Sequence, residues 1–185
     1  MSDACAMKRL FYQLSSYQER YNSRSAEVER FCQLIEMSER CACRDYFDPG
    51  HLTGSAWVVD ESSSRVLLLH HGKLKRWLQP GGHADGEFDL ASVALRETRE
   101  ESGLTRLSLV NEAIFDIDIH QIPSRGSEPA HLHFDVRYLV RADSSEQLVL
   151  SHESRDLAWI EVEQLQQYTT EESVLRMARN AIGCL

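Results

Sequence analysis

The chain has 185 residues, of which 42% are hydrophobic and 26% are charged, and its formal net charge is -9. This composition is typical of one globular domain of ordinary size and excludes a disordered or fibrous chain. The acidic balance argues against binding to nucleic acid polymers, which requires a basic face. The apolar runs are far shorter than the roughly 20 residues of a membrane-spanning helix, and the N-terminus lacks the pattern of a secretory signal. We therefore expect a cytoplasmic protein that does not associate with membranes.

The first 40 residues predict two amphipathic helices, one on each side of a break at residues 22–25. Apolar side chains recur there at intervals of three and four residues, which places them on one face of a helix. The recurring residues are Met7, Leu10, Phe11, Leu14, Tyr17 and Tyr21 in the first helix, and Val28, Phe31, Cys32 and Ile35 in the second.

The pattern changes to short strands from about residue 52. Residues 55–60 and 65–71 are apolar runs on either side of a polar turn, which predicts a hairpin. Further on, residues 107–120 and 130–140 alternate between apolar and polar, as strands do. The segment 121–129 contains two prolines and a glycine and reads as a loop. The alternation places two sets of polar residues each on one side of a strand: Asp116, Asp118 and His120, and His131, His133, Asp135 and Arg137.

Two further helices have recognisable boundaries. Asp89 stands at an N-cap position and Gly103 at the usual terminator, with Ala91, Ala94, Leu95 and Thr98 as the expected packing stripe between them. After a last strand at 157–162, the capping box at residues 169–172 predicts the start of a C-terminal helix. That helix would bury Val174, Met177, Ala178, Ala181 and Ile182.

The five cysteines are expected to be reduced thiols. Their number is odd, and Cys41 and Cys43 have neither the spacing nor the second pair of a zinc site. Thiols also stay reduced in the cytoplasm.

The helix between Asp89 and Gly103 carries an unusual group of acids. Glu97, Glu100 and Glu101 lie at offsets of three and four residues, so they would crowd onto one face and repel one another. A divalent cation such as Mg²⁺ or Mn²⁺ would relieve this repulsion and could join the carboxylates to the oxygens of a diphosphate. Glu97 and Glu101, one helical turn apart, are the main expected ligands, and Glu100 is a third ligand or the base that acts on water.

The segment Gly81 to Leu104 resembles the Nudix box. Arg96-Glu97, Thr98, Glu100-Glu101, Gly103 and Leu104 follow the second half of that pattern in order. The first half departs from it by one residue, because Phe88 stands where the pattern counted from Arg96 has a glutamate, and Glu87 lies one place early.

The resemblance implies a Nudix-like α/β/α sandwich with a mixed sheet at residues 50–185, preceded by an N-terminal helical extension at residues 1–49. It also implies metal-dependent hydrolysis of a diphosphate bond in a small molecule, such as a nucleoside diphosphate linked to another group. The carbonyl of Gly82 or Gly81 would add to the metal site. Arg96 would orient a glutamate. Glu153, or its rival Asp156, would help the metal or the water.

Other candidates for substrate contacts are less specific. Arg137 could hold a phosphate, or it could form an ion pair with Asp135 or Asp118. His131 and His133 could contact substrate, bind a transition metal, or serve as ordinary strand histidines. Arg76, close to Lys73 and Lys75, could attract an anionic substrate or be a solvated turn residue.

Two other functions and three roles for the N-terminal helices stay open. A nucleotide-sensing Nudix module without turnover would tend to lose the box glutamates, which this chain keeps. The isopentenyl diphosphate isomerase of the same fold uses a cysteine in a setting that none of these cysteines has. The N-terminal helices could cover the cleft, form a homodimer or complete the core.

Overall fold

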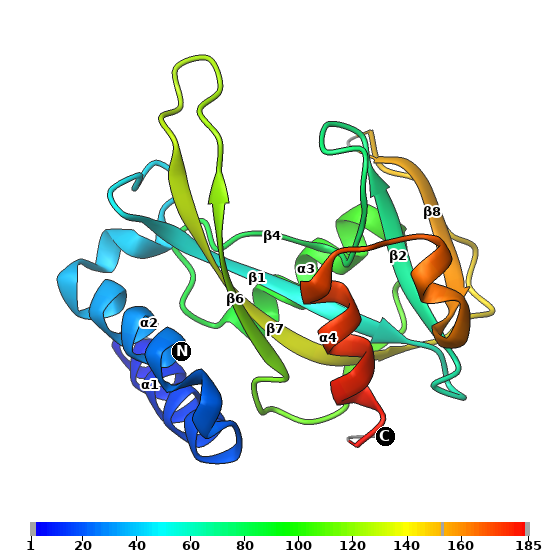
Figure 1. Cartoon of the computed structure of the whole chain (residues 1–185), viewed down its shortest axis with the longest axis horizontal. Helices are drawn as coiled ribbons and strands as arrows, with labels where there is room; N and C mark the ends of the chain where they lie inside the picture. Colours follow the sequence, from blue (N-terminus) through cyan, green and yellow to red (C-terminus); the bar gives the residue numbers. More distant parts are fainter. Residues whose placement is uncertain (1–2, 153, 184–185) are drawn as a thin grey trace. The chain divides into compact units, whose positions relative to one another are not determined.

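The computed structural model describes residues 3–152 and 154–183, which are drawn in colour in Figure 1. The chain forms two compact units. The first consists of Met1–Gly54, Gly82–Val93 and Glu112–Tyr138, and the second of Ser55–Gly81, Ala94–Asn111 and Leu139–Leu185. These units do not follow the expected division after residue 49, which stays a prediction.

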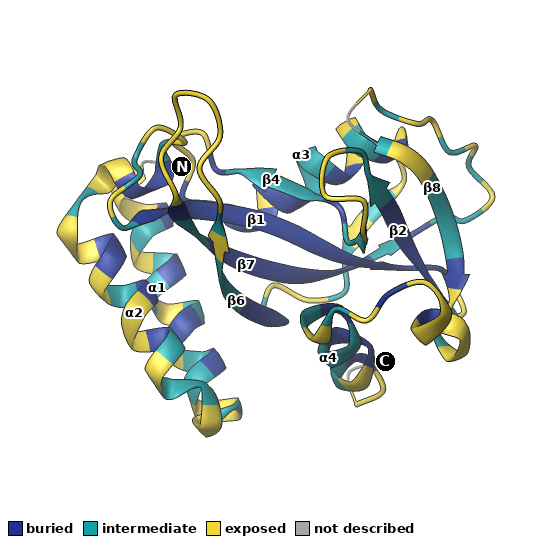
Figure 2. Cartoon of the chain, turned by 45° about the horizontal axis from the view of Figure 1, so that its top comes forward, coloured by how far each residue is buried: buried dark blue, intermediate teal, exposed yellow. Residues whose placement is uncertain are grey.

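Two N-terminal helices open the first unit, as predicted. They are α1 (Asp3–Arg20) and α2 (Ser25–Met37), joined through a single 3-10 turn, η1 (Asn22–Arg24). Their buried residues lie at the predicted helical spacing and include Leu10, Leu14, Val28 and Phe31. Figure 2 shows buried and exposed residues on different faces of both helices.

These helices complete the core of the first unit, which is one of the three roles that the sequence left open. The ring of Phe31 packs edge-on against Phe134, with 5.3 Å between centroids. Farther along, Arg20 Nη2 donates a hydrogen bond to the Ile114 carbonyl at 2.7 Å, and the Tyr17 hydroxyl donates to Asp116 at 3.4 Å.

The sheet of the first unit is built from four strands in the order β4-β1-β7-β6. They are β4 (Gly81–His83), β1 (Gly50–Val59), β7 (His131–Ala142) and β6 (Asp116–Ile122), of which β1 and β7 continue into the second unit. β6 and β7 are antiparallel, and their register places Asp116 opposite Arg137 and His120 opposite His133. Figure 1 shows the loop that joins them extending beyond both strands.

One expected strand is split in two. The alternating run 107–120 predicted a single strand, but it forms β5 (Leu107–Leu109) and β6. Both strands pair with β7. However, the stretch from Leu109 to Asp116 lies opposite a shorter stretch of β7, from Arg137 to Val140. Residues 111–114 therefore leave the ladder, a register effect that alternation within one segment cannot reveal.

The second unit is organised around β2 (Arg65–His71). It pairs with β1 in the predicted hairpin, with Val59 opposite Val66, and also with β3 (Trp77–Leu78) and β8 (Ser154–Glu161). The unit also holds most of α3 (Leu90–Ser102), η3 (Val162–Gln167) and α4 (Glu172–Ala181). The chain thus has the expected α/β class, with a mixed sheet and helices.

Two details of α4 differ from the prediction. The helix begins at Glu172, and its N-cap residue, Glu171, makes no side-chain cap bond. The hydroxyl of Thr169 accepts the Glu171 N–H at 3.2 Å, so the capping-box prediction is wrong. Ile182 lies just past the helix end and is 81% exposed, so its predicted burial is also wrong.

None of the helices in the described part of the chain is both long and apolar enough to cross a membrane. Four of the cysteines, at positions 5, 32, 41 and 43, are free thiols, and Cys184 lies outside the described residues.

Candidate functional site

The helix that carries the acidic residues, α3, has the predicted start and stop. Asp89 precedes the helix, and its Oδ1 accepts the Ser92 N–H at 3.4 Å. Gly103 follows the helix with a φ of 73°, a left-handed conformation that favours glycine. Thr98 is fully buried, and its hydroxyl donates to the Ala94 carbonyl at 2.7 Å. Threonine therefore suits this position, where the motif has an aliphatic residue, because its polar group is satisfied within the helix.

The α3 carboxylates, meaning Glu97, Glu100 and Glu101, all lie in the second unit together with Arg96. Arg96 Nη1 is 2.6 Å from Glu97 Oε1 and 3.7 Å from Glu100 Oε1. The Glu97 side chain is 14% exposed and the Glu100 side chain 59%. One guanidinium thus contacts two of the three carboxylates, which agrees with an orienting role for Arg96.

The third carboxylate is held at the glycine segment. Glu101 Oε2 accepts the backbone N–H of Gly81 at 2.9 Å, a contact within the second unit. It joins the first residue of the box to a glutamate near its end. Carboxylate oxygens are the hard donors that Mg²⁺ and Mn²⁺ take, so this donor set fits such an ion. Gly82 lies in β4 of the first unit.

The departure in the first half of the box has a packing explanation. Phe88 is only 5% exposed and belongs to the core, whereas Glu87 is exposed. The Glu87 N–H donates to the Ala84 carbonyl at 3.0 Å in a tight turn, where Gly86 has a φ of 92°. The turn therefore directs the aromatic ring inward and leaves the glutamate at the surface.

Arg137 is enclosed by carboxylates of the first unit. Its side chain is 2% exposed, and its guanidinium nitrogens lie 2.7 Å from Asp135, 3.0 Å from Asp116 and 3.4 Å from Asp118. Burial works to lower the pKa of Arg137, but the three carboxylates outweigh it and raise that pKa. The structure therefore shows the ion-pair alternative, and a phosphate contact through Arg137 stays a prediction.

A group of histidines lies on β1, β4 and β7 of the first unit. Ligand atoms of His51, His131 and His133 all lie within 4.8 Å of one another, and we call these three residues the histidine cluster. The ring of His83 is 5.1 Å from that of His51 and 5.2 Å from that of His133. The cluster draws on β1 and β7, and His83 lies on β4, so adjacent strands bring these rings together.

The protonation of these histidines is shifted by their surroundings. Burial, followed by the neighbouring His83, lowers the pKa of His51 to about 4. Burial, followed by His51 and His83, lowers the pKa of His133 to about 2. Burial also lowers the pKa of His83. These rings are therefore neutral at pH 7.

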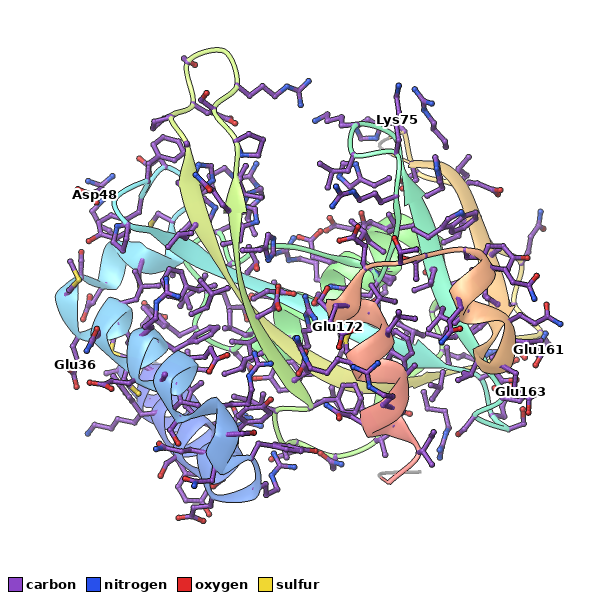
Figure 3. All side chains as sticks on the ribbon, in the orientation of Figure 1. Glu36, Asp48, Lys75, Glu161, Glu163 and Glu172 are labelled. Atoms are coloured by element: carbon purple, nitrogen blue, oxygen red, sulfur yellow. The ribbon has the colours of Figure 1, made fainter. Side chains whose placement is uncertain are left out.

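The remaining candidates lie at the surface or outside the described residues. Arg76 is 60% exposed on its side chain and pairs with Glu171 at 3.0 Å. Lys75, labelled in Figure 3, lies in the exposed turn between β2 and β3. Glu153 lies outside the described residues, and its rival Asp156 accepts the Leu157 N–H at 2.8 Å.

A family model described as NUDIX domain matches residues 51–180. The chain belongs to the Nudix family. This assignment confirms the resemblance that the box residues carry. The same match covers the sheet and α3 but not α1 or α2.

Several known proteins are similar to parts of this Nudix chain. A probable DHNTP pyrophosphohydrolase of Lactococcus lactis is 28% identical over 120 residues, which cover 63% of this chain and 69% of that protein. Among solved structures, an Ap4A hydrolase of C. elegans has a TM-score of 0.58 at 20% identity, over 71% of this chain and 95% of that one. The dihydroneopterin triphosphate pyrophosphohydrolase of E. coli has a TM-score of 0.55 at 17% identity, over 72% and 94%. These structures share the Nudix fold.

His51 and His83 are the site residues that sequence reasoning missed in this Nudix chain. The pattern His-x-His made His131 and His133 visible, because the two lie on one strand face. His51 lies far from His131 in the sequence and enters the group through strand pairing, where the Leu132 N–H donates to the Pro49 carbonyl at 3.0 Å. Its signal was a lone histidine next to a glycine at the start of a strand.

Proposed function

We propose that this Nudix chain hydrolyses a diphosphate bond in a nucleotide-like small molecule, with Mg²⁺ or Mn²⁺ held by the α3 carboxylates. The observation that carries the proposal is the contact between Glu101 Oε2 and the Gly81 N–H at 2.9 Å. It fixes one acid at the glycine segment, while Glu97 and Glu100 share Arg96 on the same helix. A plain solvated helix needs neither arrangement.

In this proposal the acids have separate duties. Glu97 and Glu101 hold the ion, because Glu97 is partly shielded and Glu101 is positioned by the backbone. The ion, when bound, polarises the phosphoryl group and makes a bound water more acidic. Glu100, with 59% of its side chain exposed, has room for water beside it and takes the proton as general base. Arg96 orients Glu97 and Glu100, and a role for the Gly82 carbonyl at the metal stays a prediction.

The names of similar proteins support this class of substrate. The Lactococcus lactis relative is named a probable DHNTP pyrophosphohydrolase, and the C. elegans neighbour an Ap4A hydrolase. Both names refer to phosphate anhydrides, which agrees with a carboxylate site that needs a cation to accept an anionic substrate. Arg76, with Lys73 and Lys75 nearby in sequence, would attract such a substrate. A role of Glu153 in assisting the water stays a prediction.

The test is a turnover screen of the full chain with Mg²⁺ and with Mn²⁺. The panel includes dihydroneopterin triphosphate, Ap4A and ADP-ribose, and the products are separated by chromatography. We expect metal-dependent turnover of at least one compound by the intact chain and by Glu87→Gln, a matched control that changes an exposed glutamate of the same box. Glu101→Gln should lose at least about 100-fold in kcat/KM, because the ion supplies several kcal/mol to the transition state.

Two results would contradict the proposal. Equal turnover by the intact chain and Glu101→Gln would remove the metal assignment. Binding of a nucleotide-like compound without turnover of any compound on the panel would favour a nucleotide-sensing module.

A further inference from the structure

The polar face of the sheet in the first unit has two halves of different chemistry. One half is the Arg137 ion-pair group, in which one guanidinium contacts three carboxylates. The other half is the histidine cluster, in which His51 is 1% exposed and His131 is 6% exposed. Buried imidazoles normally find hydrogen-bond partners, so this half requires an explanation.

One nitrogen of the cluster is left unsatisfied. His51 Nε2 is buried and has no hydrogen-bond partner within the described part of the chain. A buried polar group without a partner costs about 1–3 kcal/mol. His51 Nδ1 lies 3.2 Å from the Tyr46 carbonyl, so the ring donates from Nδ1 and presents a lone pair at Nε2.

His131 is held in the same way. Its Nδ1 lies 2.8 Å from the Pro129 carbonyl, which again leaves Nε2 as the lone-pair nitrogen. Histidines that ligate metals almost always donate their other ring N–H to a carbonyl or carboxylate, which fixes the tautomer and the ring orientation. Two of the three rings in the cluster therefore have the outer-shell partners of metal ligands.

The separation of the rings suits a small ion. Nitrogen ligands of tetrahedral zinc lie about 3.3 Å apart, as follows from a Zn–N bond of about 2.0–2.1 Å. The ligand atoms of the cluster already lie within 4.8 Å of one another before any ion is bound. Small ring rotations would close the difference.

We propose that His51, His131 and His133 form a transition-metal site of the zinc class, with a fourth coordination position open to the adjoining pocket. That pocket has a volume of about 210 Å³. It is lined by Arg44, Asp45, Phe47, His51, His83, Glu128 and His131. Asp45 and Glu128 add negative charge around a bound cation. The volume accommodates several waters or a small anion, since one water occupies about 30 Å³ of liquid.

The histidine cluster differs from the α3 carboxylates in the atoms that it offers to a metal ion. Imidazole suits Zn²⁺, Cu²⁺ and Ni²⁺, whereas Mg²⁺ takes oxygen ligands. The histidine cluster lies wholly in the first unit, and the α3 carboxylates lie wholly in the second. A zinc-binding role takes the place of substrate contact for His131 and His133.

The test is equilibrium dialysis of the full chain against Zn²⁺ in the presence of excess Mg²⁺, with bound zinc measured by mass spectrometry. Excess Mg²⁺ competes with zinc at sites made only of oxygen ligands, so the retained zinc reports nitrogen or sulfur ligands, and the histidine variants identify which. We expect about one zinc ion per chain, both in the intact protein and in Glu101→Gln. His51→Ala and His133→Ala should each weaken zinc binding more than the roughly 10- to 100-fold that the loss of an outer-shell partner costs.

The matched control is His120→Ala. The His120 ring is 5.5 Å from that of His133, and its Nδ1 contacts Asp118 at 3.1 Å, so the variant disturbs the neighbourhood without removing a ligand. Zinc binding should be retained. The proposal is overturned if both cluster variants keep zinc, or if zinc is lost in Glu101→Gln or His120→Ala.

A second measurement needs no variant and so does not depend on whether a variant folds. The intact chain is loaded with Co²⁺ under the same excess of Mg²⁺, and its visible spectrum is recorded. We expect the intense d–d bands of a four-coordinate ion with imidazole ligands. The weak spectrum of octahedral Co²⁺, or the absence of any bound Co²⁺, would overturn the proposal.

Discussion

The α3 carboxylates and the histidine cluster are two sets of metal-binding side chains that arise in different ways. The carboxylates fall within five consecutive residues, 97–101, and the helix brings them together by its own periodicity. The histidines come from two strands that lie far apart in sequence, and pairing between these strands assembles them. The first set offers hard oxygen donors and the second neutral nitrogen donors.

This difference between the two sets shows which kind of site can be predicted from a single sequence. Spacing within one element is visible in the sequence, so the acidic face could be predicted together with its ion. A site that forms across strands depends on strand order and register, neither of which the sequence of one chain discloses. The same limit applies to Arg137, whose three partners come partly from β6.

The largest expected effect tests the base among the α3 carboxylates. Glu100→Gln should lower kcat by about 100- to 10,000-fold, because an amide cannot accept the proton from water. Steady-state kinetics with a substrate found in the screen give this value, and Mn²⁺ affinity is measured in parallel. Unchanged kcat, or a loss explained by weaker Mn²⁺ binding alone, would make Glu100 something other than the base.

The next effect separates ion pairing from substrate binding in the first unit. Arg137→Met leaves Asp116, Asp118 and Asp135 without their shared cation and should cost about 3–5 kcal/mol in the free energy of unfolding. Denaturant unfolding measures the loss. Arg76→Met, which breaks an exposed pair, should cost no more than about 1 kcal/mol. A stable Arg137→Met protein with a raised KM would restore the phosphate-binding interpretation.

A smaller effect concerns the glycine that ends α3. An alanine Cβ at position 103 would lie 2.7 Å from Val149 Cβ, and it would also occupy a left-handed conformation. At Gly86 the φ is also positive, at 92°, but a Cβ would meet nothing within 4 Å. Gly86→Ala should therefore cost about 1–2 kcal/mol, and Gly103→Ala roughly 1–3 kcal/mol more. Thermal unfolding compares the two, and equal losses would contradict the close approach of Val149.

The smallest effect concerns the reactivity of a buried thiol, Cys41. Burial, followed by the neighbouring Cys43, raises the pKa of Cys41 to about 12. Because the thiolate is the reactive form, Cys41 should resist iodoacetamide at about pH 8, and its reactivity should rise only as the pH approaches that pKa or the chain unfolds. Cys5, which is exposed, should react first. Peptide mass spectrometry assigns the labelled sites, and rapid labelling of Cys41 would contradict its burial and raised pKa.

Local patterns predicted much of the fold. Helical periodicity located α1 and α2, the polar turn located the β1–β2 hairpin, and Asp89 with Gly103 bounded α3. The errors came from competition with tertiary contacts. Pairing with β7 divided the expected strand at 107–120, and Thr169 satisfied a loop N–H in place of the predicted cap.

The candidate site, like the fold, could be predicted where it depends on local spacing and not where it depends on tertiary contacts. The second half of the Nudix box directed attention to Glu97, Glu100 and Glu101 without any structure. The contact of Glu101 with Gly81 depends on how the glycine segment folds back onto the helix, which spacing does not describe. Arg137 could be a phosphate contact or an ion pair on sequence grounds, and only the burial of its guanidinium distinguishes the two.

The most direct test of the account is an Mn²⁺ titration followed by electron paramagnetic resonance, with the intact chain, Glu101→Gln and His51→Ala compared. The proposed division between oxygen and nitrogen donors predicts that Glu101→Gln weakens Mn²⁺ binding, whereas His51→Ala binds Mn²⁺ as the intact chain does. Unchanged binding in Glu101→Gln, or loss of Mn²⁺ in His51→Ala, would contradict the account.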